Sequence, residues 1–261
     1  MQFRHIYKSA LLMFFMLLLS GCAKKEQVPV RVDLHKGWTF KNAQDTMWFS
    51  ASVPGNIHSD LLEHNRISHP FVGNNEEDLQ WISERNWEYK NAFELPDHIL
   101  KKEHIELHFE GLDTYADVYL NGQLILSAAN AFLEYTLDVK HIASKTNELK
   151  VLFKPTSSVE EKASAALGYS LPEEPRVFTR KAQFQYGWDW GPKLNGIGIS
   201  KDISIDAWDN YKIENIYIKN NSALPSSAAV ERMFLVGKDV WNPKHAHLND
   251  EHFQMLIFLK D

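Results

Sequence analysis

Cysteine is almost absent from this chain, which has 261 residues and a single cysteine, Cys22. One thiol cannot form a disulfide within the chain or a cysteine-ligated zinc site. No other position can supply a cysteine nucleophile. The sequence therefore excludes a disulfide-stapled fold and a thiol-based active site in the body of the chain.

A surplus of basic residues is also absent. Lys and Arg number 28 against 34 Asp and Glu, which gives a net charge of -6. A chain with this balance has no excess charge to hold a phosphate backbone, so we expect no nucleic-acid partner. The hydrophobic share of 44% and the charged share of 24% exclude a disordered or fibrous chain. The 8 Trp residues fit sugar binding, but Trp is also common in β-sandwich cores, so this count alone does not decide.

Long apolar runs are missing except for one near the N-terminus, over residues 11–19, which follows Arg4 and Lys8. The run is too short to span a bilayer as a helix. It ends at Leu19-Ser-Gly-Cys22, which resembles a bacterial lipobox, where the cysteine is lipidated; the alternative is a plain signal peptide with an incidental cysteine. We expect a lipoprotein signal peptide over 1–21, a tether over 22–30 and an exported, membrane-anchored bacterial lipoprotein in the periplasm or cell envelope, held by its N-terminal lipid.

The short signatures of several enzyme classes are missing too. The chain contains no G-x-G-x-x-G, no P-loop and no G-x-S-x-G. Strands that alternate with long helices are not indicated, which disfavours a doubly wound sheet or an (α/β)-barrel.

What is present is a series of short β-rich segments with period-2 alternation. The expected fold is all-β, a jelly-roll β-sandwich with a few short helices. Asn121-Gly122 supplies the two positive-φ residues of a type I′ hairpin turn, and Asn56 is the expected cap of a short helix. The expected strands cover 29–34, 37–42, 47–53, 86–94, 104–111, 115–120, 123–127, 132–138, 148–154, 201–207 and 211–218; the expected helices cover 56–64, 77–83 and 157–166.

The densest group of polar and aromatic residues lies at Trp188-Asp189-Trp190, where Gly187 and Pro192 indicate a structured loop. Two indoles beside one carboxylate suit a pyranose, because the rings pack on its C–H face while the carboxylate accepts hydrogen bonds from hydroxyls. The alternative is a buried Trp pair with Asp189 capping backbone amides.

Histidine clusters give weaker signals. His58 and His64 are six residues apart on the first expected helix, too far to chelate, and we expect satisfied surface or capping histidines. The spacing of the histidines and acids near the C-terminus matches no metalloprotease pattern, so we expect no metal and no cofactor. That group comprises His245, His247, Asp250, Glu251 and His252. The acidic runs 74–78 and 172–175 are expected to be solvated loops.

Several ordered motifs resemble the N-terminal domain of β-mannosidases of glycoside hydrolase family 2. The β-mannosidase branch is indicated by Val53-Pro-Gly-Asn-Ile-His and by Arg180-Lys-Ala-Gln-Phe-Gln-Tyr-Gly-Trp-Asp-Trp-Gly-Pro192. A Leu112-Asp-Thr-x-Ala-x-Val-x-Leu-Asn-Gly122 run is shared by the wider family. The other matching motifs are Ile67-Ser-His-Pro-Phe71, Asn75-Glu-Glu-Asp-Leu-Gln-Trp-Ile82 and Trp87-Glu-Tyr89.

The resemblance implies a galactose-binding-like jelly roll over 31–210 that packs beside a catalytic barrel. It also implies that Trp188, Asp189 and Trp190 bind the terminal mannose. In the family both catalytic residues are glutamates on the barrel, which needs roughly 250 residues of its own. We therefore expect no catalytic residue in this chain, the start of a truncated immunoglobulin-like domain over 211–230 and an atypical tail over 231–261. A truncated gene and a split enzyme with its barrel on a separate chain both fit this expectation.

The sequence thus predicts the substrate-contacting domain of an enzyme that releases terminal β-mannose from oligosaccharides, inactive by itself. Its expected partners are a β-mannoside or another oligosaccharide and a separate chain with the barrel. The alternative is a stand-alone carbohydrate-binding surface lipoprotein. One departure from the family concerns Gly196-Ile-Gly-Ile-Ser200, where a Gly-Ile-Trp run is usual, so the packing after the loop is expected to differ.

Overall fold

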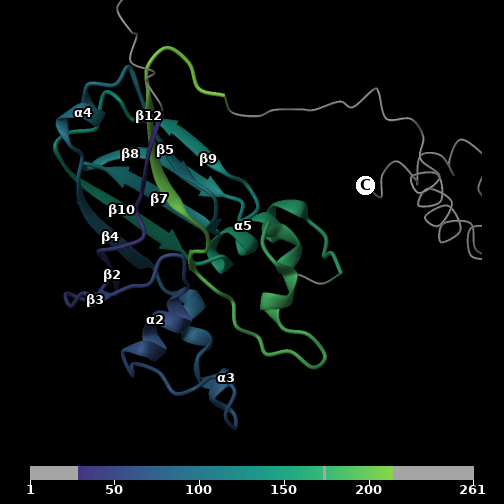
Figure 1. Cartoon of the computed structure of the whole chain (residues 1–261). Helices are drawn as coiled ribbons and strands as arrows, with labels where there is room; N and C mark the ends of the chain where they lie inside the picture. The colour runs from purple at the N-terminus through teal and green to yellow at the C-terminus, as the bar shows by residue number, and fades with distance from the viewer. Residues whose placement is uncertain (1–28, 173–174, 214–261) are drawn as a thin grey trace, which may run out of the picture. The chain divides into compact units, whose positions relative to one another are not determined.

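The computed structural model describes residues 29–172 and 175–213 (Figure 1). All of these except Ile213 belong to one compact unit. Cys22, the signal peptide, the predicted tail and its histidines lie outside the described residues, as does most of the strand predicted over 211–218. Residues 211–213 form no strand. Within the described part, no helix has the length and apolar character needed to cross a membrane.

Two antiparallel sheets form the body of the domain, so the predicted all-β sandwich is confirmed. One has the strand order β1-β12-β5-β9 and the other β3-β2-β4-β10-β7-β8, with a small pair β11-β6 beside them. The strands are β1 (Val30–Asp33), β2 (Trp38–Asn42), β3 (Phe49–Ser50), β4 (Trp87–Glu94), β5 (His104–Phe109), β6 (Leu112–Asp113), β7 (Tyr115–Leu120), β8 (Gln123–Ala129), β9 (Tyr135–Asp138), β10 (Thr146–Lys154), β11 (Gly198–Ile199) and β12 (Ile203–Trp208).

The core lies between the sheets because alternate residues of each strand are buried. In β10 the buried positions include Leu149, Val151 and Phe153, and Leu107 and Phe109 do the same in β5. This period-2 burial is what the alternating sequence pattern predicts. At the β7–β8 turn, Asn121 and Gly122 have φ of 52° and 82°, so the predicted hairpin is confirmed.

Short helices lie at the two ends of the sandwich. They are α2 (Ile57–Glu63), α3 (Asn75–Asp78), α4 (Asp97–Leu100) and α5 (Ser157–Leu167), with 3₁₀ turns η1 (Gln80–Glu84), η2 (Arg176–Phe178) and η3 (Gln183–Tyr186). Asn56 caps α2 as predicted, its side chain accepting from the Ser59 amide at 3.1 Å. The helix predicted over 77–83 is divided into α3 and η1. Helix α4 was not predicted.

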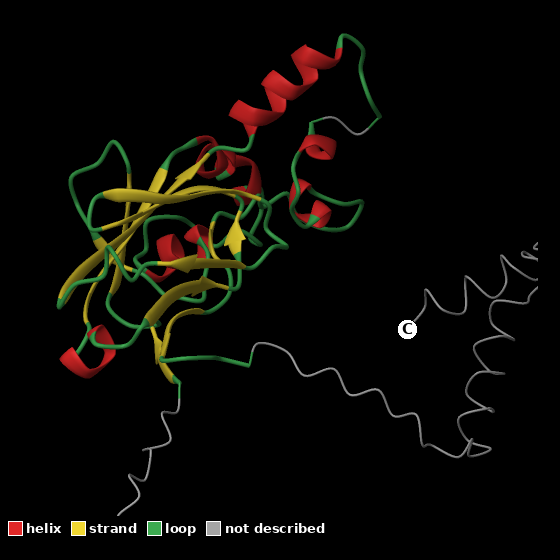
Figure 2. Ribbon diagram, turned by 90° about the horizontal axis from the view of Figure 1, so that it is seen from above, coloured by secondary structure: helices red, strands yellow, loops and turns green. Residues whose placement is uncertain are grey.

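The arrangement places α2, α3 and the segment 175–196 at the same end, while α4 lies at the opposite end (Figure 1). Seen from above, α5 projects from the strands, and the chain then returns beside it through η2 and η3 (Figure 2). The loop that carries Trp188-Asp189-Trp190 is therefore attached to the sandwich near α2 and α3.

Candidate functional site

The Trp188–Trp190 segment forms a tight turn. The Trp188 amide donates to the Gly191 carbonyl and the Gly191 amide donates to the Trp188 carbonyl, both at 3.2 Å. This pairing places Asp189 and Trp190 at the tip. The two indole rings meet edge to face, with centroids 6.2 Å apart and planes at 76°.

The side chains of this turn are exposed. Trp188 is 53% exposed and Trp190 85%, and Asp189 is also exposed. Among the described residues, the carboxylate of Asp189 has no hydrogen bond or ion pair. The alternative of a buried Trp pair with Asp189 as an amide cap is therefore wrong. An exposed indole normally costs free energy unless something covers it, so the turn has the character of a contact surface.

A largely apolar groove lies beside the turn, with a volume of about 720 Å³. A second hollow of about 560 Å³ continues it toward α2. Phe71 and Phe184 border both hollows and are themselves about 70% exposed. The groove residues are Phe71, Phe184, Gln185, Trp188, Trp190, Gly191, Pro192 and Leu194.

The segment around Gly55 holds the strand that follows the loop. The amide of Gly55 donates to the carbonyl of Ile199, and the amide of Ile57 donates to that of Ile197, both at 2.8 Å. A Cβ on Gly198 would lie 2.7 Å from the Gly55 carbonyl oxygen, so the two backbones touch. The departure at Gly196-Ile-Gly-Ile199 is thus well packed, because only glycine fits position 198 and both isoleucines are buried.

The second arm of the loop, which follows the turn, is hydrogen-bonded to the acidic helix α3 and to η1. The Lys193 amide donates to the Glu76 carboxylate, and the Gln80 side chain donates to the Lys193 carbonyl at 2.8 Å. The prediction that residues 74–78 form a solvated loop is wrong, because Asn75–Asp78 is helical and Glu76 binds the loop backbone.

Gln185 donates to the carboxylate of Asp113 at 2.9 Å, and both residues line the second hollow together with Gly55. Four segments that are distant in sequence, around residues 55, 76–80, 113 and 181–196, therefore meet at one site. They coincide with the motifs on which the resemblance to β-mannosidases rests. A family model described as glycosyl hydrolase 2 galactose-binding domain-like matches residues 38–201. The chain belongs to this family.

Relatives of this galactose-binding-like domain are named as β-mannosidases. The chain is 31% identical to β-mannosidase B of Aspergillus terreus over 75% of its length and 24% of the relative's. It is 31% identical to the β-mannosidase of Mus musculus over 76% and 24%. The crystal structure of the β-D-mannosidase of Dictyoglomus thermophilum matches with 37% identity and a TM-score of 0.72, over 75% of this chain and 24% of that one. The chain thus spans about a quarter of the length of these relatives.

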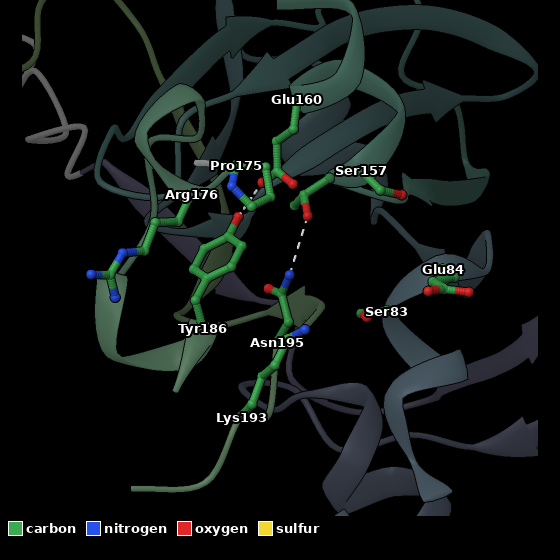
Figure 3. Close-up of a pocket in the computed structure, with 10 residues that line it drawn as sticks. Ser83, Glu84, Ser157, Glu160, Pro175, Arg176, Tyr186, Lys193 and Asn195 are labelled. Atoms are coloured by element: carbon green, nitrogen blue, oxygen red, sulfur yellow. Dashed lines mark hydrogen bonds between the residues drawn. The ribbon is translucent and has the colours of Figure 1, made fainter. Parts of the chain in front are cut away.

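A polar pocket of about 360 Å³ lies behind the loop of the galactose-binding-like domain (Figure 3). Glu160 of α5 is almost fully buried there and accepts hydrogen bonds from Tyr186 and, at 2.7 Å, from Thr179. Burial and the hydrogen bond to Glu160 raise the pKa of Tyr186, so its hydroxyl stays protonated and donates. Asn195 donates to Thr156 at 3.1 Å on the other side of the pocket. Helix α5, through Glu160, and its N-cap Thr156 therefore contact the segments before and after the turn.

The two predicted histidines behave differently, of which His58 lies in α2 and His64 is its C-cap. His64 is hydrogen-bonded to Ser50, as the prediction of a satisfied capping residue requires. His58 is buried and lines the same hollow as Asp113, so the prediction of a surface histidine is wrong for it. Burial, assisted by the nearby charge of Lys181, lowers the pKa of His58 to about 4. Among the described residues, no group of histidines and acids has the arrangement of a metal site.

Sequence reasoning singled out the Trp188-Asp189-Trp190 loop but missed the residues that hold it, namely Glu76, Gln80, Asp113, Glu160, Lys181, Gln185 and Asn195. All of these are charged or amide side chains, which are usually expected on the surface. For Glu76, Gln80, Asp113, Lys181 and Gln185 the one available signal was their position within the family motifs, and for the other two there was none.

Proposed function

We propose that this domain supplies part of the pocket that binds the terminal mannose in a β-mannosidase-like glycoside hydrolase. The observation that carries the proposal is the Trp188-Asp189-Trp190 turn, which is exposed, has a carboxylate without a partner in the described structure and is held by a buried network. The β-mannosidase names of the relatives support mannose as the sugar.

The chemistry of the turn fits a pyranoside. An indole ring packs on the C–H face of the sugar ring. That face of the sugar is apolar, and the apolar side chains of Phe184 and Pro192 line the groove in which it would lie. The carboxylate of Asp189 accepts hydrogen bonds from two neighbouring hydroxyls, and an ionised acceptor makes such bonds strong. The indole thus binds the apolar C–H surface of the sugar, and the carboxylate binds its hydroxyl groups.

The hydrolytic step needs two further carboxylates about 5–5.5 Å apart in a retaining enzyme. We propose that they come from outside the described domain, either from a further part of the protein or from a separate chain. The role of the domain is then to hold the sugar, and it does not cleave the glycosidic bond. No observation favours the alternative of a stand-alone carbohydrate-binding lipoprotein.

The test is an NMR titration of the ¹⁵N-labelled full chain with methyl β-mannoside and, separately, its C2 epimer methyl β-glucoside. We expect the indole N–H signals of Trp188 and Trp190 to shift with the mannoside, with a dissociation constant on the order of millimolar, because one loop offers few contacts. Asp189→Asn keeps the shape of the side chain and removes its charge, so it should weaken the response about tenfold.

The matched control is Asp45→Asn, which removes an exposed carboxylate from the β2–β3 turn and should leave the titration unchanged. Indole signals that do not move, or that move equally in Asp189→Asn, contradict the proposal.

We also propose that Cys22 is lipidated and anchors the protein to a membrane, on the strength of the Leu19-Ser-Gly-Cys22 run alone. Cells that express the protein and are fed an alkyne-tagged fatty acid should label it, and Cys22→Ser should abolish the label. Lipidation also retains the protein in the membrane fraction. Equal labelling of the two proteins refutes the anchor.

A further inference from the structure

Lys181 is the most unusual residue of the loop region, because its side chain is completely buried. An ammonium group has three N–H donors and is costly to bury unless all of them are satisfied. The Nζ of Lys181 lies 3.1 Å from a carboxylate oxygen of Asp113. It also donates to the Asn195 side chain and to the Gly196 carbonyl, each at 2.6 Å.

These three contacts join three separate segments. Lys181 precedes the turn, Asn195 and Gly196 follow it, and Asp113 lies at the end of β6. Gln185 adds a second link, since it donates to the other Asp113 oxygen at 2.9 Å and accepts from the Gly196 amide at 2.8 Å. The two arms of the loop are therefore closed against each other and fixed to the sandwich.

Stability alone does not explain a charged pair in this place. Burial lowers the pKa of Lys181, and Asp113 opposes that shift, so the ion pair partly offsets its own desolvation. Apolar side chains of similar size often stabilise a fold as well as a buried ion pair does. The ion pair fixes the first arm of the loop to β6, and the same ammonium joins the second arm through Asn195 and Gly196. Directional bonds of this kind select one geometry more strictly than apolar contacts do.

We propose that Lys181 is a positioning residue that sets the conformation of the Trp188-Asp189-Trp190 turn through Asp113, Asn195 and Gly196. That the positioned turn binds a sugar rests on the proposed function above. The connection to loop geometry stands on the contacts themselves.

The test compares the full-length wild type with Lys181→Met/Asp113→Asn. The single substitution Lys181→Met would leave a buried unpaired carboxylate and destabilise the whole domain. The double substitution removes both charges, so the unfolding midpoint should fall less than in Lys181→Met alone. The hydrogen bonds from position 181 to Asn195 and Gly196 are lost all the same.

The primary measurement is hydrogen–deuterium exchange of the peptides that cover 183–196. Several amides of this loop are hydrogen-bonded in the wild type, among them those of Trp188, Gly191 and Gly196. We expect them to exchange at least roughly tenfold faster in the double variant, because two bonds to a charged donor are lost. The exchange of β10 should not change.

The matched control is Lys102→Met/Asp209→Asn, a less buried ion pair at 2.8 Å, which joins the residues just after α4 to the residues after β12. It should leave exchange in the loop unchanged. A second variant, Gln185→Met, keeps the ion pair and breaks only the amide link, so it should speed exchange at Gly196.

Loop exchange that is unaltered in Lys181→Met/Asp113→Asn overturns the inference. If that variant exchanges faster everywhere, the inference is decided by Gln185→Met, where continued protection of Gly196 also overturns it. The mannoside titration separates this result from the proposed function. Loss of the indole response in the double variant supports both the proposed function and the positioning role. If the wild type shows no response to mannoside but the loop of the double variant exchanges faster, the proposed function is refuted and the positioning role is supported.

Discussion

Gly55→Ala should cost about 3 kcal/mol or more of folding free energy and lower the unfolding midpoint by roughly 6–12 °C. A Cβ at this position would lie 2.2 Å from the carbonyl oxygen of Ser52. The obstacle is backbone, which cannot rotate away as a side chain does. Gly55 also donates to Ile199, so any shift pulls on the strand that follows the loop.

Two further glycines calibrate the result in the same thermal unfolding experiment. Gly198→Ala meets the Gly55 carbonyl at 2.7 Å and should cost less than Gly55→Ala but remain clearly destabilising. Gly73→Ala meets nothing within 4 Å and costs only its positive φ of 56°, about 1 kcal/mol. If the unfolding midpoint of Gly55→Ala equals that of Gly73→Ala, the steric argument for Gly55 is contradicted.

Features that depend on neighbouring residues could be predicted from the sequence. Asn121-Gly122 predicts its turn because few residue pairs tolerate two positive φ values, and Asn56 predicts a helix start because its side chain reaches the next turn. The strands follow for the same reason, since period 2 is a property of the strand itself.

Features that depend on distant residues could not be predicted. Lys181 and Glu76 are charged, and nothing in their sequence neighbourhoods shows that Asn195 or the Lys193 amide will meet them. The order of the six-stranded sheet is of the same kind, because β2 and β10 pair with β4 across long stretches of chain. The chemistry of Trp188-Asp189-Trp190 was evident from residue types, but its exposure is a property of the folded loop.

Acidification should destabilise the domain through His58 by about 3 kcal/mol between pH 6.5 and pH 4. The unfolded chain binds a proton near pH 6.5, whereas the buried imidazole binds one only near pH 4. The stabilisation from the neutral imidazole is therefore complete above pH 6.5. It is lost as the pH falls through this window, and there is no further loss below it.

Urea unfolding at several pH values measures this effect, with His58→Met as the variant. His58 makes no hydrogen bond among the described residues, so Met removes the titration at small structural cost. Burial raises the pKa of Asp60 in the same helix, which contributes a pH dependence of opposite sign. Asp60 is present in both proteins, so subtracting the two curves isolates His58.

The subtraction should give a small difference that is flat above pH 6.5 and that shifts by about 3 kcal/mol in favour of His58→Met toward pH 4, because only the wild type loses stability through this group. His98→Gln, which removes an exposed imidazole from α4, should run parallel to wild type. Parallel curves for His58→Met as well would contradict the buried neutral state. Because Lys181 lowers the pKa of His58, the Lys181→Met/Asp113→Asn protein should lose less stability than the wild type between pH 6.5 and pH 4, which would connect the acid sensitivity of α2 to the residue that fixes the loop.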